Sequence, residues 1–278
     1  MAMTSPSGRS MRAVSNGVLV LIGVCFLAPM LWLLLASVDT RATLTVKWPE
    51  QFSLDNFLAV LTPETSLIPL WNSLLLSGGC AILTVVCAVL AAYPLSRYRM
   101  RINKPFLYGI LFGTCLPITA MMVPVYSLFV SLNLIDSIGG SILFLAATSL
   151  PMAIWMTKNF MDSVPISLEE AAWMDGASMM TTLTRVVVPL MRPGIGVVFI
   201  FVFIQAWGNF FVPFVLLLSP DRQPAAVSIF TFFGQYGSVA YGQLAAFSLI
   251  YSVPVLALYV LVSRGMGGSF ALAGAVKG

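Results

Sequence analysis

The sequence contains no histidine and very little charge. Charged residues make up 9% of the 278 positions and hydrophobic residues 59%, whereas a soluble domain carries roughly 25% charge. Without histidine, the chain lacks the commonest general base and the commonest metal ligand. These absences disfavour an enzyme and favour a protein that resides in a membrane.

Cysteine motifs and phosphate-binding motifs are also missing. The four cysteines lie inside apolar stretches without C-x-x-C spacing, where they behave as small hydrophobes. No G-x-x-x-x-G-K-[ST] segment occurs, so ATP is not bound through that motif. We therefore expect no cofactor and no metal in this chain.

Six apolar runs are long enough to cross a bilayer, which requires about 20 residues. The first run is too long for a cleaved signal peptide, so we expect it to remain as an anchor. The sequence thus predicts an all-α membrane protein with six transmembrane helices at 17–38, 70–94, 106–128, 138–157, 193–218 and 244–263.

Basic residues are distributed unevenly between the segments that connect these runs. Three of the fourteen, Arg41, Lys47 and Arg222, fall on one side, and the other eleven fall on the opposite side. Because basic residues accumulate in the cytoplasm, both termini and the loop 158–192 are expected there. The expected organisation is an N-terminal tail 1–16, a membrane domain 17–263 and a C-terminal tail 264–278, in the cell (inner, cytoplasmic) membrane.

No predicted span contains Asp, Glu, Lys or Arg. An ion-coupled carrier generally needs such a group within the membrane, although inserting one costs roughly 2.5–3.5 kcal/mol. The energy source is therefore expected on another subunit. A self-sufficient secondary transporter or channel for a small polar solute is the alternative.

One polar stretch, Ser167–Ser178, interrupts the second half of the chain. Ser167 is a suitable N-cap, and Glu170 three residues later would complete a capping box. Gly176 provides a helix stop because glycine accepts a left-handed backbone. These residues predict a helix of two to three turns whose surface Glu169, Glu170 and Asp175 make acidic.

The same stretch resembles the EAA loop of permease subunits in binding-protein-dependent ABC importers. The matching positions are Glu170, Ala171, Ala172, Asp175, Gly176 and, thirteen residues after the glycine, Pro189. The resemblance implies the type I ABC importer permease fold. It also implies that the loop forms a coupling helix that docks on an ATPase subunit.

Four weaker motifs are similar to the shorter permease of maltose-type carbohydrate importers: Asn72-Ser73, Ala92–Arg97, Pro124 with Tyr126, and Gly274–Gly278. The likeness implies a heterodimer with a second permease, two ATPase subunits that bind ATP and Mg, and an extracytoplasmic solute-binding protein. The tail from Gly265 to Gly278 is expected to contact the ATPase pair. Which sugar, polyol or glycerophosphodiester is carried, and which permease holds it, stays open.

The fifth run carries polar groups at mid-membrane. Gln205 and Asn209 stand four residues apart, with Trp207 between them. Amides hydrogen-bond to sugar hydroxyls and an aromatic ring stacks on a sugar face, so these residues are candidates for the substrate pathway. Hydrogen bonding between helices, with Trp207 packed, is the alternative.

Overall fold

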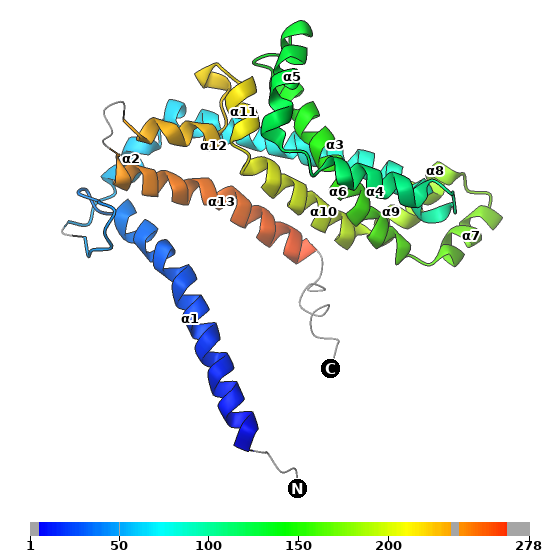
Figure 1. Ribbon diagram of the computed structural model, residues 1–278, viewed down its shortest axis with the longest axis horizontal. Coiled ribbons are helices and arrows are strands. Elements are labelled where there is room, and N and C mark those ends of the chain that lie inside the picture. The colour runs from blue at the N-terminus through cyan, green and yellow to red at the C-terminus, as the bar shows by residue number, and fades with distance from the viewer. Residues whose placement is uncertain (1–5, 50, 235–238, 266–278) are drawn as a thin grey trace. The chain divides into compact units, whose positions relative to one another are not determined.

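The computed structural model describes residues 6–49, 51–234 and 239–265 of a chain that is almost entirely helical (Figure 1). The expected contacts of the tail 266–278 lie outside the described residues. Two compact units divide the chain. One unit combines the segments 1–62 and 229–252, and the other combines 63–228 and 253–278.

The first unit is held together by contacts of the Asn56 side chain. It contains α1 (Pro6–Ser37), α2 (Asp55–Val60), η4 (Ile229–Phe232) and the beginning of α13 (Tyr241–Gly265). The Asn56 amide donates to the carbonyls of Ser37 and Asp39, at 3.1 and 3.0 Å. A Cβ atom at Gly242 would lie 2.5 Å from that amide, so only glycine permits this approach.

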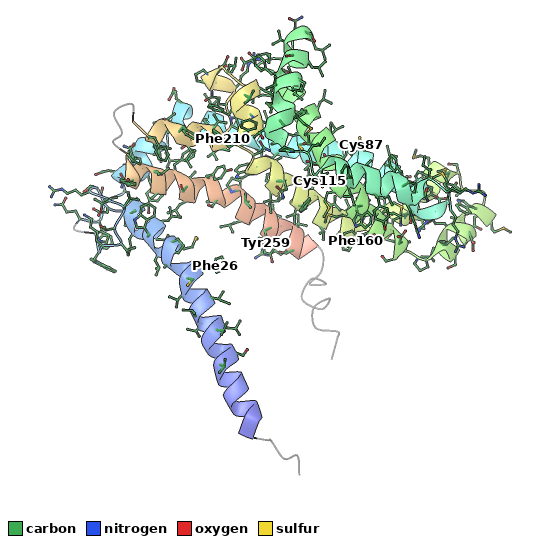
Figure 2. All side chains as sticks on the ribbon, in the orientation of Figure 1. Phe26, Cys87, Cys115, Phe160, Phe210 and Tyr259 are labelled. Atoms are coloured by element: carbon green, nitrogen blue, oxygen red, sulfur yellow. The ribbon has the colours of Figure 1, made fainter. Side chains whose placement is uncertain are left out.

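The apolar part of α1 exposes most of its side chains. The segment Val14–Ser37 has a mean hydropathy of 2.8 in its most apolar window, and none of that window is buried. Phe26 is 74% exposed and projects away from the helix (Figure 2). A helix that is apolar all round and unburied is suited to lipid.

The second unit holds most of the helices. Its elements are η1 (Pro63–Leu67), α3 (Ile68–Arg97), α4 (Asn103–Gly113), α5 (Ile118–Ser131), α6 (Ile138–Asp162), α7 (Ile166–Met174), α8 (Met179–Thr182), η2 (Leu183–Val187), α9 (Val188–Leu190), α10 (Arg192–Trp207), α11 (Phe211–Leu216), η3 (Pro220–Arg222) and α12 (Ala225–Ser228).

A bundle of α3, α6 and α10 forms the centre of this unit (Figure 1). Small residues let the helices approach closely: a Cβ at Gly79 would lie 2.7 Å from Ile142, and one at Gly194 would lie 2.5 Å from Phe160. Close approach through small residues is the usual packing mode of membrane helices. Either glycine is therefore a site where a larger residue would force the bundle apart.

In the described part of the chain, four helices are long and apolar enough to span a membrane, and six spans are reached when each bent helix pair counts as one. The predicted third run is bent by 89° between α4 and α5. The predicted single fifth helix over 193–218 is wrong, because α10 ends at Trp207 and α11 begins at Phe211. The Asn209 side chain accepts the Val212 N–H at 3.0 Å just before α11, whose N-cap position is Phe210.

Candidate functional site

The predicted polar helix exists as α7, but it starts differently. Pro165 occupies the N-cap with an extended backbone, φ −59° and ψ 129°, and no side chain caps the helix. Ser167 lies inside the first turn, so the predicted N-cap and capping box are wrong. A proline is tolerated just before the helix because it has no N–H to satisfy there and its φ is fixed near −65°.

The predicted helix stop at Gly176 is confirmed. Gly176 has a φ of +82°, which a residue with a Cβ adopts only with strain. Its N–H donates to the Trp173 carbonyl and the Ala177 N–H donates to the Ala172 carbonyl, both at 3.0 Å. This is the Schellman arrangement, which satisfies the last carbonyls of the helix.

Glu169 is buried, not part of an acidic surface as the sequence predicted. Its side chain is 0% exposed, and the Arg97 Nε atom donates to its Oε1 at 2.5 Å. The Tyr93 hydroxyl donates to Oε2 at 2.8 Å. Both carboxylate oxygens are thus bound by α3, and a buried charge held in this way is costly to leave unpaired.

Arg97 extends this contact to α6. Its Nη2 donates to the Val164 carbonyl at 3.2 Å and its Nη1 to the Ser96 Oγ at 3.0 Å. Ser96 in turn donates to the Asp162 carboxylate at 2.5 Å. One arginine therefore connects the last turn of α3 with the end of α6 and with α7.

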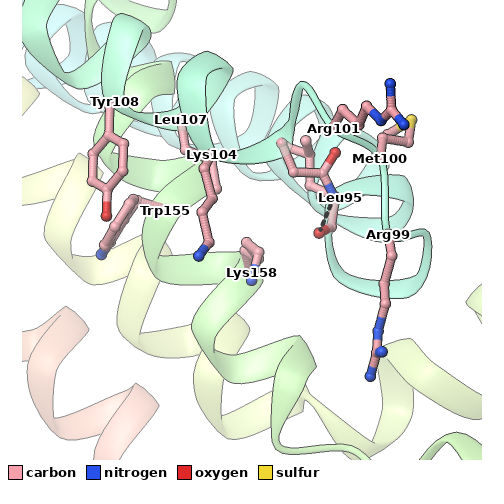
Figure 3. Close-up of a pocket in the computed structure, with 10 residues that line it drawn as sticks. Leu95, Arg99, Met100, Arg101, Lys104, Leu107, Tyr108, Trp155 and Lys158 are labelled. Carbon is pink, nitrogen blue, oxygen red and sulfur yellow. Dashed lines mark hydrogen bonds between the residues drawn. The ribbon is translucent and has the colours of Figure 1, made fainter.

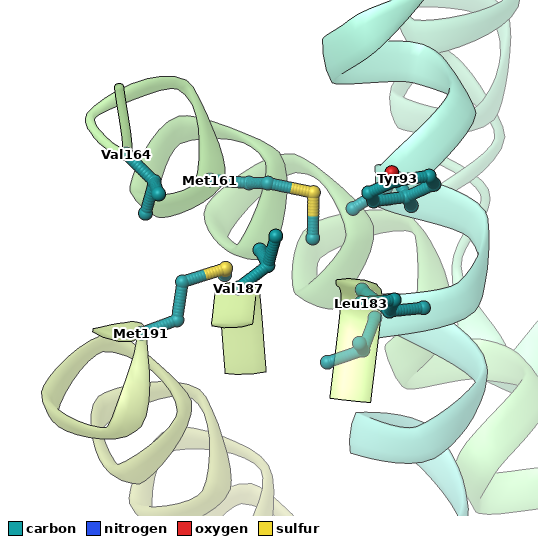
Figure 4. Packing of buried hydrophobic residues seen from close by; sticks show 8 residues of the cluster. Tyr93, Met161, Val164, Leu183, Val187 and Met191 are labelled. Atoms are coloured by element: carbon teal, nitrogen blue, oxygen red, sulfur yellow. The ribbon is translucent and has the colours of Figure 1, made fainter. Parts of the chain in front are cut away.

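A hydrophobic cluster lies beside this ion pair. It joins α3, the end of α6, η2 and the start of α10 (Figure 4) and consists of Val89, Ala92, Tyr93, Met161, Val164, Leu183, Val187 and Met191. Tyr93 belongs to both the cluster and the Glu169 contact. The segment after α7 is consequently anchored to the bundle by packing as well as by charge.

The residues that match the EAA pattern present a distinct surface. Glu170, Ala171, Asp175 and Gly176 are exposed, while Ala172 and Pro189 are partly buried. Four large apolar side chains near them in the sequence are also exposed: Trp173, Met174, Met179 and Met180. Met174 is the most exposed of the four, at 88%. We call the exposed residues of α7 together with these four side chains the α7 face. Exposed apolar side chains of this size are candidates for contact with a partner protein or a membrane.

A cavity of about 450 Å³ contains two of the predicted pathway residues. Gln205 and Asn209 line it together with Thr148, Ser149 and Phe201. Trp207 does not line it: its side chain is 4% exposed and stacks on Phe203 with ring centroids 5.5 Å apart. Among the described residues, no group of Cys, Asp and Glu side chains is arranged to hold a metal ion.

The other end of α3 holds a different loop. The Asn72 amide donates to the carbonyls of Asp221 and Gln223, at 2.8 and 3.2 Å. The Ser73 hydroxyl accepts the Ala225 N–H at 2.8 Å. The sequence singled out Asn72 and Ser73 as a motif, and their contacts fix the chain between η3 and α12.

Asp136 holds the same loop from the opposite side. Its Oδ1 accepts the N–H groups of Leu218 and Ser219, both at 3.0 Å, and its Oδ2 accepts the Ser219 hydroxyl. Burial by itself would raise the pKa of the Asp136 carboxyl, but these bonds and the nearby Arg222 guanidinium lower it below its ordinary value.

Sequence reasoning missed Glu169 and Asp136. The sequence did contain a signal for the role of Glu169. Arg97 ends a long apolar helix and requires an acidic partner near the membrane surface. Four acidic residues of the loop 158–192 could have provided it, namely Asp162, Glu169, Glu170 and Asp175, and choosing among them requires the fold. The role of Asp136 had no comparable signal.

Known proteins are similar to the chain over most of its length. Residues 84–268 match the family "binding-protein-dependent transport system inner membrane component". A sulfoquinovosyl glycerol transport system permease protein of Agrobacterium fabrum is 30% identical over 98% of this chain and 95% of its own length. A diacetylchitobiose uptake system permease protein of Streptomyces coelicolor is 27% identical over 95% and 88%. A putative ABC transporter permease protein of Streptomyces antibioticus is 37% identical over 74% and 89%.

A solved structure shares the fold. A chain of a bacterial ABC transporter that imports the acidic polysaccharide alginate superposes with a TM-score of 0.81, covering 95% of this chain and 99% of the other, at 22% identity. The likeness confirms the predicted all-α fold of an importer permease.

Proposed function

The chain belongs to the family of binding-protein-dependent transport system inner membrane components, and from this premise we propose that it carries a sugar or related carbohydrate into the cell. As a permease subunit of an ABC importer it is a transport protein, and ATP hydrolysis belongs to separate subunits. The expected alternative of a self-sufficient secondary transporter is therefore set aside.

The observation that carries the carbohydrate assignment is similarity along the full chain to permeases named for glycosides. The cavity that Gln205 and Asn209 line supports it, because Thr148 and Ser149 add hydroxyl groups to the two amides. Amides and hydroxyls provide both donors and acceptors, which sugar hydroxyls require. We propose that this cavity is part of the solute pathway and that Trp207 supports it by packing.

The α7 face is the proposed contact with an ATPase subunit. Its exposed Met174 and Trp173 supply apolar area, and Glu170 and Asp175 supply charge at its border. Because Glu169 of the same helix is bound to α3, movement of α7 moves α3 with it. ATP and Mg would then act on the partners, and this chain would transmit their closure to the membrane bundle.

The remaining partners and the orientation complete the proposal. We propose a heterodimer with a second permease, two ATPase subunits and an extracytoplasmic solute-binding protein. Both termini and the α7 face lie in the cytoplasm, which the distribution of eleven against three basic residues supports. A cysteine at Ser178 that a membrane-impermeant maleimide labels from outside intact cells would contradict this orientation.

The assignment is tested with the assembled importer and its binding protein in proteoliposomes. Mono- and oligosaccharides are expected to stimulate ATP hydrolysis and to be taken up, whereas stimulation by amino acids, peptides or inorganic ions alone would overturn it. In the same assay, Asn209→Leu should lower uptake several-fold, since a lost hydrogen bond costs about 0.5–1.5 kcal/mol. Trp207→Ala serves as the comparison and should lower thermal stability first.

A further inference from the structure

A second cavity, with a volume of about 550 Å³, lies where α3, α4 and α6 meet. The four basic side chains Arg99, Arg101, Lys104 and Lys158 line it, and no acidic side chain does. It is separate from the α7 face and from the cavity that holds Gln205. Nothing in the transport cycle proposed above uses it.

The basic groups gather there because of local structure. Arg99 and Arg101 lie on the turn after α3, and the Asn103 amide fixes this turn by donating to the carbonyls of Leu95 and Tyr98, at 3.2 and 2.6 Å. Lys104 lies on the first turn of α4 and Lys158 on the last turns of α6. Figure 3 shows the ammonium groups of both lysines pointing into the same space.

Most of this charge has no counterion among the residues that the structure describes. Lys158 pairs with Asp162 at 2.6 Å. Among the described residues, no acidic side chain forms an ion pair with Arg99, Arg101 or Lys104. The ammonium groups of Lys104 and Lys158 repel each other in this space, while Arg99 and Arg101 extend at its edge (Figure 3), so an anionic ligand would stabilise the arrangement.

The rest of the lining is apolar and aromatic. Tyr108 and Trp155 close one side of the cavity, with ring centroids 6.2 Å apart (Figure 3). Leu95 and Leu107 are buried in its wall. Tyrosine and tryptophan favour the boundary between headgroups and hydrocarbon, so this cavity has the composition of a site at that depth.

From this combination we propose that the cavity binds the phosphate headgroup of an anionic phospholipid from the cytoplasmic leaflet. The cations hold the phosphate, and the aromatic and leucine side chains contact the glycerol backbone and the start of the acyl chains. The proposal rests on the orientation in "Proposed function", which puts this end of α3 in the cytoplasm. Its test measures retained lipid and not uptake, so the two proposals can fail separately.

The first test requires no variant. The assembled importer is reconstituted in nanodiscs of phosphatidylcholine with phosphatidylglycerol, extracted, and analysed for retained lipid by native mass spectrometry. Phosphatidylglycerol is expected to be retained in preference to phosphatidylcholine, and to stay bound when inorganic phosphate is added. Equal retention of the two lipids, or displacement by inorganic phosphate, would overturn the proposal in favour of no site or of a site for a soluble anion.

The second test locates the site with charge-matched variants. Arg99→Gln/Lys104→Gln should weaken retention about 25-fold, because each basic side chain near an anionic lipid contributes about fivefold, or ~1 kcal/mol. The control Arg192→Gln/Arg264→Gln removes two exposed cations elsewhere on the proposed cytoplasmic side. Equal retention in both double variants contradicts the proposal, and so does loss of the partner subunits from the pocket variant alone, which would make the cavity a protein interface.

Discussion

The two ends of α3 hold their neighbouring loops by different chemistry. At one end, Asn72 and Ser73 bind backbone groups between η3 and α12 through neutral hydrogen bonds. At the other, Tyr93 and Arg97 bind the buried carboxylate of Glu169 on α7. The same helix thus makes neutral hydrogen bonds to a loop at one end and a buried ion pair to α7 at the other.

The energy of a single contact differs between these two attachments. A neutral hydrogen bond contributes about 0.5–1.5 kcal/mol net. Removing one partner of a buried ion pair costs about 3–5 kcal/mol, because it leaves an uncompensated charge. The contacts of Asn72 and Ser73 can therefore break one at a time at low cost, with Asp136 still holding the loop, whereas α7 stays with α3. The firm attachment of α7 to α3 supports the proposal that α7 transmits force from an ATPase subunit.

Breaking the charged attachment should have the largest effect. Arg97→Met leaves Glu169 buried without its cation and is expected to lower the free energy of unfolding by about 3–5 kcal/mol. Unfolding by SDS measures the loss, with the exposed Arg192→Met as control. Arg97→Met/Glu169→Met should recover most of the stability, and a double variant as unstable as the single one would show that the charge is not the cause.

Disrupting the end of α7 should have the next largest effect. Gly176→Pro replaces a φ of +82° by about −65° and removes the N–H that binds the Trp173 carbonyl, at a combined cost of about 3 kcal/mol. Binding-protein stimulation of ATP hydrolysis should be lost while the chain still inserts. Gly78→Ala is the control, since no atom lies within 4 Å of a Cβ placed there. Normal stimulation in Gly176→Pro would show that the shape of α7 is unimportant.

The neutral attachment should be weaker. Asn72→Leu removes two hydrogen bonds and is expected to cost about 2 kcal/mol, seen as faster hydrogen exchange in residues 217–225. Asn159→Leu, at an exposed position of α6, should leave this exchange unchanged. A stability loss as large as that of Arg97→Met would remove the difference between the two ends of α3.

The smallest expected effect depends on pH. Because folding lowers the pKa of Asp136, its contribution to stability is present above the ordinary value of 3.8 and is lost as the pH falls through the lower folded value. The protection factors of residues 217–222, which are exchange rates corrected for the intrinsic rate at each pH, should therefore fall at acidic pH below 3.8. In the variant Asp136→Asn, residues 217–222 should exchange faster at neutral pH, and this pH dependence should disappear. An unchanged pH dependence would show that another titrating group causes it.

The sequence correctly predicted the structural features that are determined by residues close to one another along the chain. The apolar runs located the long helices, and Gly176 located the end of α7 because only one residue type suits that backbone. The break after Trp207 was missed because the apolar run continues on both sides of Gly208 and Asn209, and Asn209 was interpreted as a solute-facing side chain of a continuous helix. Glu169 was misplaced because its partner lies 72 residues earlier, and no local pattern distinguishes it from Glu170.

The central claim is that α7, fixed to α3 through Glu169, contacts the ATPase. The most direct test is a thiol crosslink from Ala171→Cys in the assembled importer, with the exposed Cys25 and Cys115 changed to serine. We predict a crosslink to an ATPase subunit, and a weaker yield when Glu170→Lys reverses the charge next to it. Absence of any crosslink from this position or from Met174→Cys, while uptake stays normal, would contradict the account.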